Sequence, residues 1–236
     1  MYIYVEYLDN YVHMSDLKKN MGKRTRSGAA ASGSLELWLH AAYELLLESG
    51  VEAVRIMPLA KRLRLSRTSF YWFFHDRESL LAALLERWRT KNTGNLVRQA
   101  ESYAESLPEA VLNVFDCWFD DRLFDSRLEF AVRSWAQQSS LVAGEVIAAD
   151  ADRLRALTSL FIRFDCNRLE ADVRARTLYL TQLGYISQKS PEEQGVRMRR
   201  ISKYVEIFAG ILAEPRELNR FFARHGYRLK RDAPSA

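Results

Sequence analysis

The most constraining feature of this chain is the stretch from Leu59 to Leu81, which reads LAKRLRLSRTSFYWFFHDRESLL. Its apolar residues recur at helical spacing on both sides of a short polar break at Ser66, which predicts two short helices joined by a tight turn. Such a helix-turn-helix presents its second helix in a way that fits the major groove of DNA. The stretch therefore predicts a DNA-binding fold.

Positive charge is concentrated around the same stretch. From Val54 to Arg77 the chain carries six basic residues and one acidic residue, Asp76. The whole chain has a formal net charge of +5, so the residues outside this segment are balanced in charge. Because neutralisation of phosphates supplies sequence-independent affinity for DNA, this local excess favours a polyanionic partner.

Composition places the chain in the all-α class. Its 236 residues are 48% hydrophobic and include only ten glycines and five prolines, and few segments after residue 34 alternate with period two. No uncharged apolar run approaches the ~18 residues of a membrane span. The first residues lack the basic and apolar regions of a secretory signal. We expect a cytoplasmic protein without a membrane partner.

Residues that commonly carry chemistry are sparse and scattered. Cys117 and Cys166 lie far apart and in no metal-binding spacing, so we expect buried free thiols rather than a disulfide. The histidines also lack metal-ligand spacing, and no nucleophile elbow or glycine-rich phosphate loop is present. An enzyme is therefore not expected, and neither is a cofactor. The histidines are His13, His40, His75 and His225.

Residues 1–33 differ from the rest of the chain. Five basic residues between 18 and 26 precede a Gly/Ala/Ser run, which predicts a flexible basic arm. This arm either follows DNA phosphates or is an unstructured leader. A three-helix DNA-binding domain is expected over 34–80, a helical C-terminal domain over 81–228 and a tail over 229–236. Within the C-terminal domain, helices are expected near 109–120, 126–138, 141–164, 168–187, 191–213 and 216–224.

The recognition helix is expected to begin after Ser66, whose hydroxyl suits an N-cap, and to bury one aromatic side. On a helical wheel Phe70, Phe73 and Phe74 share that side and are interpreted as core. Arg67, Thr68, Tyr71, Trp72 and His75 occupy the opposite arc. The two sides therefore predict a buried anchor and an exposed reading face.

With these residues in place, the N-terminal third resembles the TetR/AcrR family of bacterial transcriptional regulators. The resemblance covers about residues 34–85. It rests on Gly50, Leu59-Ala60, Ser66, Tyr71-Trp72-Phe73-Phe74, Arg77 and Leu80-Leu81, in the order and spacing of the family. Two positions depart from the pattern, because Arg64 stands where a turn glycine is usual and Val54 where threonine or serine is frequent. Arg64 is therefore expected to occupy a strained turn, since a non-glycine residue at positive φ is disfavoured.

Several residues are candidates for DNA contact, and each has a simpler structural alternative. Arg67 is expected either to pair with a guanine or to touch only phosphate. The resemblance implies that Tyr71 donates to a phosphate, and a core tyrosine is the alternative. His75 and Arg77 either bind phosphate or favour a helix end through their charge. The full set is Lys61, Arg62, Ser66, Arg67, Thr68, Ser69, Tyr71, Trp72, His75 and Arg77.

The C-terminal region is rich in aromatic residues. The resemblance implies a helical dimerisation domain that encloses a small apolar or aromatic effector, although most of these aromatics are also explained as core. The ligand-binding candidates are Phe115, Trp118, Trp135, Phe161 and Tyr179. The family also implies a dimer interface made by the last two long helices, with Tyr179, Leu183, Ile186, Val205 and Phe208 as candidate contacts.

The sequence thus favours a homodimeric, non-enzymatic regulator, most simply a repressor, that binds a palindromic operator in double-stranded DNA and is released by a small-molecule effector. The competing hypothesis is a protein-interaction module that kept the helix-turn-helix shape without binding DNA. The unusual Arg64 and the bulky Trp72 are the residues that leave this alternative open.

Overall fold

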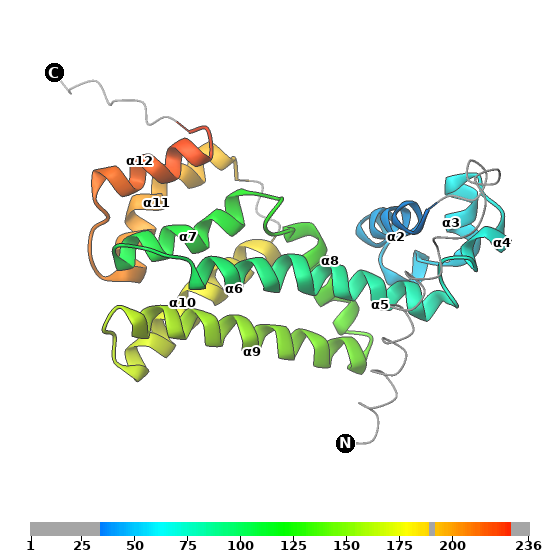
Figure 1. The fold of residues 1–236 in the computed structure, drawn as a ribbon, viewed down its shortest axis with the longest axis horizontal. Coiled ribbons are helices and arrows are strands. Elements are labelled where there is room, and N and C mark those ends of the chain that lie inside the picture. Colours follow the sequence, from blue (N-terminus) through cyan, green and yellow to red (C-terminus); the bar gives the residue numbers. More distant parts are fainter. Residues whose placement is uncertain (1–33, 189–191, 228–236) are drawn as a thin grey trace, which may run out of the picture.

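The computed structural model describes residues 34–188 and 192–227, and its described residues form helices and connecting turns without strands (Figure 1). The predicted all-α class is confirmed. The expected arm (1–33) and tail (229–236) lie outside the described residues. The elements are α2 (Leu35–Ser49), η2 (Val51–Ala53), α3 (Ile56–Leu63), α4 (Arg67–Phe70), α5 (Arg77–Trp88), η3 (Arg89–Thr93), α6 (Gly94–Glu101), α7 (Leu107–Phe119), α8 (Ser126–Ala136), α9 (Ser140–Arg163), α10 (Arg168–Ser187), α11 (Gln194–Ala209) and α12 (Pro215–Arg224).

The N-terminal helices begin where their capping residues predict. The side chains of Ser34, Ser66 and Asp76 each accept a hydrogen bond from a backbone amide three residues further on. Asp76 forms a reciprocal capping box with Ser79. Helix α2 ends at Gly50, whose φ of 76° is the positive value that favours glycine. These local signals set the lengths of α2, α4 and α5.

The helices α5, η3 and α6 join the N-terminal helices to the rest of the molecule, and η3 and α6 run along α9 (Figure 1). The middle segment, η3, is a π-helical turn, a rare form in which one extra residue fits into a helix. Asn92 and Thr93 within this turn are buried. The domain boundary expected from the sequence, between residues 80 and 81, falls inside α5. This helix is therefore shared by the two predicted domains.

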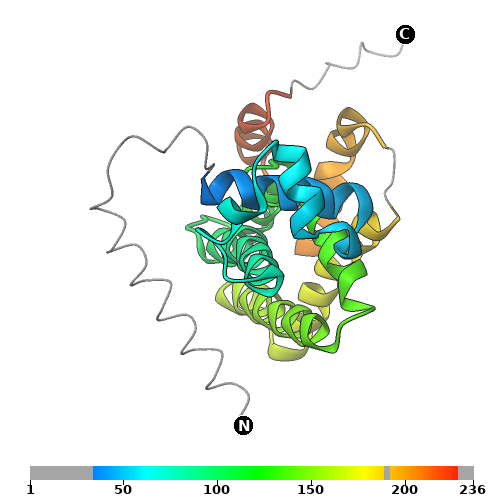
Figure 2. The ribbon, with the colours of Figure 1, turned by 90° about the vertical axis from the view of Figure 1, so that its right-hand side faces the viewer.

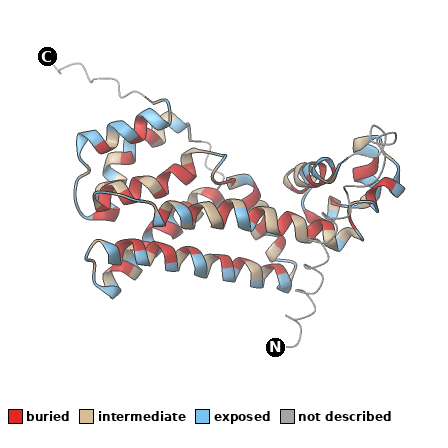
Figure 3. Ribbon diagram, viewed as in Figure 1, coloured by how far each residue is buried: buried red, intermediate tan, exposed pale blue. Residues whose placement is uncertain are grey.

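Two hydrophobic clusters hold the helices together (Figure 3). The first joins the N-terminal helices and α5 to α8 and the start of α9, through residues such as Leu128 and Val146. The second lies among α6, α7, the second half of α9 and α10 to α12. Figure 2, seen from the end that carries α3 and α4, shows the N-terminal helices in front of the C-terminal ones. The N-terminal helices therefore share their core with α8.

A buried polar network crosses the junction of these clusters. Glu129 of α8 and Arg153 of α9 are both fully buried and pair at 2.7 Å. Glu129 also accepts hydrogen bonds from the Trp88 indole at 2.6 Å and the Asn92 amide at 2.9 Å. Burial by itself would raise the pKa of Glu129, but the charges of Arg153 and Arg133 outweigh it and hold that pKa below its ordinary value. The network fixes the π-helical turn against α8 and α9.

Candidate nucleic-acid interface and associated cavities

The turn between α3 and α4 contains Arg64 in the left-handed region, with φ 55° and ψ 39°. Its amide donates to the Lys61 carbonyl at 3.2 Å, and the Leu65 amide donates to the Ala60 carbonyl at 3.0 Å, which is a Schellman ending. A non-glycine residue in this conformation costs about 1–2 kcal/mol. The expectation that Arg64 occupies a turn with positive φ is confirmed.

Helix α4 is anchored by aromatic packing on its inner side. Phe70 is fully buried, meets Trp38 of α2 edge-on at 5.3 Å between ring centroids, and stacks on Phe74 at 5.5 Å. Phe73 is only partly buried but packs against the same cluster. The α-helical part is four residues long and continues as a turn, since the amides of Phe73 and Phe74 both donate to the Phe70 carbonyl at 3.0 Å. The predicted aromatic anchor is present.

The outer side of α4 exposes the residues predicted for the reading face. Arg67 and Thr68 are exposed, and Tyr71 and Trp72 retain 44% and 66% of their accessible surface. The Arg67 guanidinium donates to the Tyr71 hydroxyl at 2.9 Å and lies 5.6 Å from the centre of that ring. Among the described residues Arg67 contacts no carboxylate, so its full positive charge faces outward with Tyr71 supporting its position. Figure 2 shows α3 and α4 at the near end of the molecule.

Three of the residues predicted to contact DNA form hydrogen bonds within the protein. Ser69 is 2% exposed, and its hydroxyl donates to the Ser66 carbonyl at 2.8 Å, because the helix start turns this small residue inward. Arg77 donates to the carbonyls of Val54 at 2.6 Å and Val51 at 2.9 Å, so it ties α5 to the segment before α3. These are intramolecular roles that spacing alone does not predict.

Arg62 is the third of these residues, because its guanidinium forms two hydrogen bonds to the Glu48 carboxylate at 2.6 and 2.7 Å while its side chain stays 39% exposed. Lys61 is exposed next to it. Ser66 is exposed, although its hydroxyl is used in capping. The His75 side chain is 91% exposed and lies 2.8 Å from the Asp76 carboxylate. That contact and the Ser79 amide lower the pKa of Asp76. Of the predicted contacts, Lys61 and Arg67 remain as exposed positive groups around α4, and Arg64 is also exposed in the turn before this helix.

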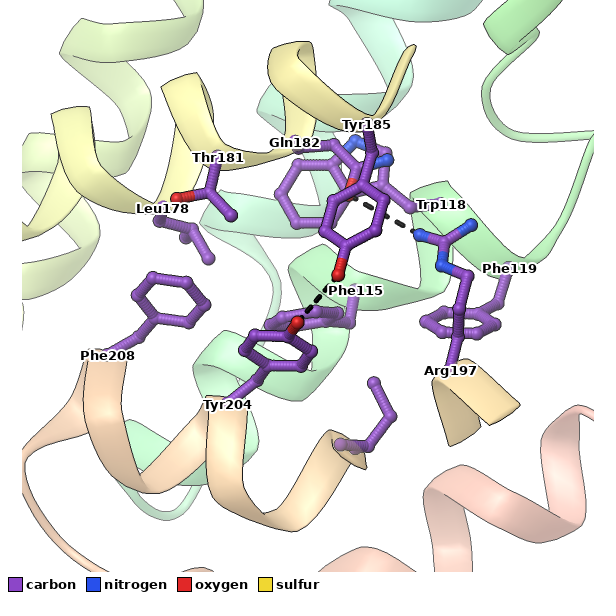
Figure 4. Close-up of a pocket in the computed structure, with 11 residues that line it drawn as sticks. Phe115, Trp118, Phe119, Leu178, Thr181, Gln182, Tyr185, Arg197, Tyr204 and Phe208 are labelled. Atoms are coloured by element: carbon purple, nitrogen blue, oxygen red, sulfur yellow. Dashed lines mark hydrogen bonds between the residues drawn. The ribbon is translucent and has the colours of Figure 1, made fainter. Parts of the chain in front are cut away.

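The predicted ligand residues do not form one site. Phe115 and Trp118 line a space of about 20 Å³ between α7, α10 and α11, which fits one water molecule (Figure 4). Phe161 is fully buried in the core, and the Tyr179 hydroxyl is held by Arg153 at 2.8 Å and Asp150 at 2.6 Å. Close packing and hydrogen bonding therefore make these four residues structural, which corrects the prediction of an aromatic pocket among them.

Trp135, the fifth predicted ligand residue, lines a larger cleft of about 520 Å³. One wall comes from the end of α2 and Gly50, and the other from α8, α10 and α11. Arg127 and Arg197 also line this cleft, and sequence reasoning missed both of them. No local signal identifies them, because the cleft forms only where α2 meets the C-terminal helices. In the described part of the chain, no cluster of three or more His, Cys, Asp or Glu could hold a metal ion.

Most of the residues predicted for a dimer interface are core residues. Tyr179, Ile186, Val205 and Phe208 are each less than 8% exposed, and Leu183 is partly buried against the second cluster. Those sides of α10 and α11 face α7 and α9, so four of the five predicted contacts pack inside the protomer and Leu183 alone among the five stays partly exposed. Exposed apolar residues lie on other parts of the same two helices and just beyond α11: Leu169, Val173, Leu180, Ile207, Ile211 and Leu212.

Comparisons with known proteins agree with this geometry. Residues 39–84 match the family described as bacterial regulatory proteins, tetR family. A tetracycline repressor protein of class G from Vibrio anguillarum is 34% identical over 74 residues, which is 31% of this chain and 35% of the relative. The chain thus matches about a third of that curated relative's length. The matched family is thus described as regulatory proteins and this relative as a repressor.

Solved structures share the fold over most of the chain. Salmonella enterica GusR superposes with a TM-score of 0.60 at 16% identity, covering 75% of this chain and 94% of that one. SmeT, the repressor of the Stenotrophomonas maltophilia multidrug efflux pump SmeDEF, gives 0.56 at 20% identity, covering 78% and 93%. At these identities the likeness shows a common fold. Among the described helices, none has both the length and the apolar character needed to cross a membrane.

Proposed function

We infer that this protein is a member of the TetR family of bacterial regulatory proteins and represses transcription as a homodimer bound to a palindromic DNA operator in the cytoplasm. The observation that carries the inference is the exposed face of α4, formed by Arg67, Thr68, Tyr71 and Trp72 on a helix whose other side is anchored by Phe70. A rigid helix with polar and aromatic residues outward suits insertion into a major groove.

Within this proposal Arg67 reads a base. Its guanidinium has no carboxylate partner among the described residues, and its contact with the Tyr71 hydroxyl at 2.9 Å limits its motion. A planar guanidinium held in this way suits the two acceptors on a guanine edge. Tyr71 and Lys61 contact phosphate, and Trp72 packs on a sugar or a thymine methyl. In this proposal Arg67 recognises a base, and the neighbouring residues position the protein on the DNA backbone.

The dimer interface in this proposal is the exposed apolar face of α10 and the end of α11. Leu169, Val173 and Leu180 follow one stripe of α10, with exposures of 75%, 53% and 56%. Ile207 lies beside this stripe, since it lines a groove of about 470 Å³ together with Val173. A stripe of this kind, self-complementary about a two-fold axis, fits a symmetric dimer. Two copies of α4 would then meet successive major grooves about 34 Å apart.

The DNA-binding part is tested by selecting genomic fragments that bind the purified protein and then measuring affinity by fluorescence anisotropy. Arg67→Ala is expected to lower affinity for the selected site by about 1–3 kcal/mol. Arg155→Ala removes an exposed arginine of α9 and should leave affinity unchanged. A dimeric, folded protein that selects no sequence and shows no salt-sensitive binding would instead be the protein-interaction module.

The dimer is tested with two matched substitutions. Leu180→Arg places a charge on the α10 stripe and is expected to give a monomer in light scattering coupled to gel filtration. Leu141→Arg alters a leucine of nearly equal exposure, 54% against 56%, at the start of α9, and should leave the dimer intact. A dimer that survives Leu180→Arg would place the interface elsewhere.

The repressor is further proposed to be released from DNA by a small molecule that binds away from α4. Such a ligand acts only through a difference in its affinity for the DNA-bound and free arrangements of the protein. The cleft of about 520 Å³ between α2 and the C-terminal helices supports this part of the proposal, because its walls belong to both regions.

A further inference from the structure

The cleft between α2 and the C-terminal helices has the size and lining of a ligand site. Its volume of about 520 Å³ lies within the usual range for small-molecule pockets. The apolar side chains are contributed by both regions, with Leu46, Leu47 and Val51 on one wall and Trp135 and Ile186 on the other. Trp135 and Ile186 come from α8 and α10, so the cleft exists only while α2 rests against these helices.

The charge of the lining is entirely positive. Arg127 and Arg197 line the cleft together with uncharged polar residues, and no aspartate or glutamate does so. Arg127 is exposed and forms no ion pair with another described residue. The ends of α2 and α8 contribute only about half a negative charge each. The lining itself thus carries two guanidinium charges, and the carboxylates that interact with them electrostatically, Glu48 with Arg127 and Glu192 with Arg197, lie outside it. The cleft therefore favours an anion.

Arg197 is the more informative of the two arginines. Its side chain lies between the rings of Phe119 and Tyr185, with its guanidinium carbon 4.9 and 5.2 Å from their centres (Figure 4). Its one hydrogen bond to another described residue runs to the Gln182 side-chain oxygen at 3.5 Å. Most of the guanidinium N–H donors are therefore available to a bound group.

Arg197 differs from the other buried or partly buried arginines in its partners. Arg153 is fully buried and Arg133 partly buried, but carboxylates surround both and raise their pKa against the opposing effect of burial. Burial lowers the pKa of Arg197, and the tyrosines and Glu192 nearby offset only part of that effect. Every other arginine of the described chain whose pKa is shifted has an acidic partner. Arg197 instead contacts the rings of Phe119 and Tyr185 and the side-chain amide of Gln182.

We propose that this cleft binds a small organic anion, with its carboxylate, sulfonate or phosphate on Arg197 and an apolar, aromatic body against Trp135, Leu46 and Ile186. The planar fork of Arg197 suits two parallel hydrogen bonds to such an acid group. Arg127 stands at the exposed part of the lining and draws the anion in by its charge. The proposal deepens the proposed function, on which it rests, by giving the effector a chemical class.

A ligand in this cleft would act on DNA binding through α2. The cleft wall at Leu46, Leu47 and Gly50 is the end of α2, and α2 carries Trp38, which packs on Phe70 of α4. A ligand whose apolar part fills the cleft would favour one position of α2 relative to α8. If that position differs from the one bound to DNA, the anion weakens operator binding, and the operator weakens anion binding by the same factor.

The test compares two fluorescent probes of nearly the same shape. 8-Anilinonaphthalene-1-sulfonate carries an acid group, and N-phenyl-1-naphthylamine is its neutral counterpart. The wild-type dimer should bind the sulfonate more tightly. Arg197→Met should weaken sulfonate binding about tenfold to a hundredfold and leave the neutral probe unaffected. Arg199→Met, an exposed arginine of the same helix, is the matched control and should change neither.

A second pair of variants tests the proposal independently if Arg197→Met alters the packing of the Phe119 and Tyr185 rings. Gln138→Glu adds a negative charge to the cleft lining, whereas Gln137→Glu adds it to the adjacent exposed residue outside that lining. The first should weaken sulfonate binding and the second should not. No binding of the sulfonate, or binding that ignores both Arg197→Met and Gln138→Glu, overturns the proposal.

The two levels of inference fail separately. Probe binding is measured on the protein without DNA, so its result does not depend on whether an operator is found. Loss of all sequence-selective DNA binding, with the probe result intact, would overturn the repressor and leave an anion-binding protein. Operator binding with no Arg197-dependent probe binding would leave the repressor and remove only the anionic class of effector.

Discussion

Removing the charge of Glu129 tests whether the buried network holds the molecule together. Glutamine has nearly the shape of glutamate, so Glu129→Gln leaves no cavity and changes charge and hydrogen bonding alone. Glu129 is fully buried and accepts bonds from Trp88, Asn92, Arg133 and Arg153. The amide would leave the fully buried guanidinium of Arg153 without its closest counter-charge.

The expected loss follows from this environment. Breaking a buried ion pair by removing one partner costs about 3–5 kcal/mol. Since the free energy of unfolding of a protein is typically about 5–15 kcal/mol, this is a large fraction of the total. Asp152→Asn makes the same chemical change in an exposed pair with Arg155, whose side chains are 52% and 67% exposed. That control should cost at most about 1 kcal/mol.

Urea unfolding followed by circular dichroism measures both values, with the protomer concentration held constant because a dimer unfolds in a concentration-dependent way. A loss below about 1 kcal/mol for Glu129→Gln, equal to the control, would refute the reasoning that the pair is essential. Replacing Glu129 and Arg153 together with methionine should recover part of the loss, because neither member of the pair is then left buried without its counter-charge.

The same pair predicts a dependence on pH. Arg153 and Arg133 outweigh the effect of burial and hold the pKa of Glu129 below its ordinary value. The stability that Glu129 contributes is therefore present above its unfolded pKa of about 4.3 and is lost as the pH falls toward the lower folded value. The difference in free energy of unfolding between wild type and Glu129→Gln should shrink below about pH 4. A constant difference down to pH 2 would contradict this assignment.

Three further predictions concern single residues. Arg64→Gly should raise the free energy of unfolding by about 1 kcal/mol, since relief of the left-handed strain exceeds the added flexibility of the unfolded chain; an unchanged urea midpoint would refute it. Phe70→Ala should lower that free energy by about 3–5 kcal/mol and weaken DNA binding with it, because the fully buried ring holds α4 on α2. Burial raises the pKa of the Cys117 thiol to about 12, so at pH 8 Ellman's reagent should label the half-buried Cys166 but label Cys117 only after unfolding.

Most local features of the fold, such as helix starts and exposed helix faces, can be predicted from the sequence. Helix starts at Ser34, Ser66 and Asp76 follow from side chains that bond amides three residues away. The left-handed turn at Arg64 is expected only through the resemblance, because the family usually has glycine at that position. The division of α4 into an aromatic anchor and an exposed face also follows, because helical periodicity alone separates Phe70 from Tyr71. These features depend on neighbours within one or two turns.

The tertiary structure decided what each side chain meets across the molecule. Arg62 pairs with Glu48 and Arg77 bonds Val51 and Val54, so two basic residues that look free for DNA are used internally. The face of α10 that packs inward is likewise set by α7 and α9. Since both faces of that helix carry apolar residues, periodicity cannot choose between core and interface. The cleft with Arg197 arises from helices distant in sequence, and only the folded chain brings its two walls together.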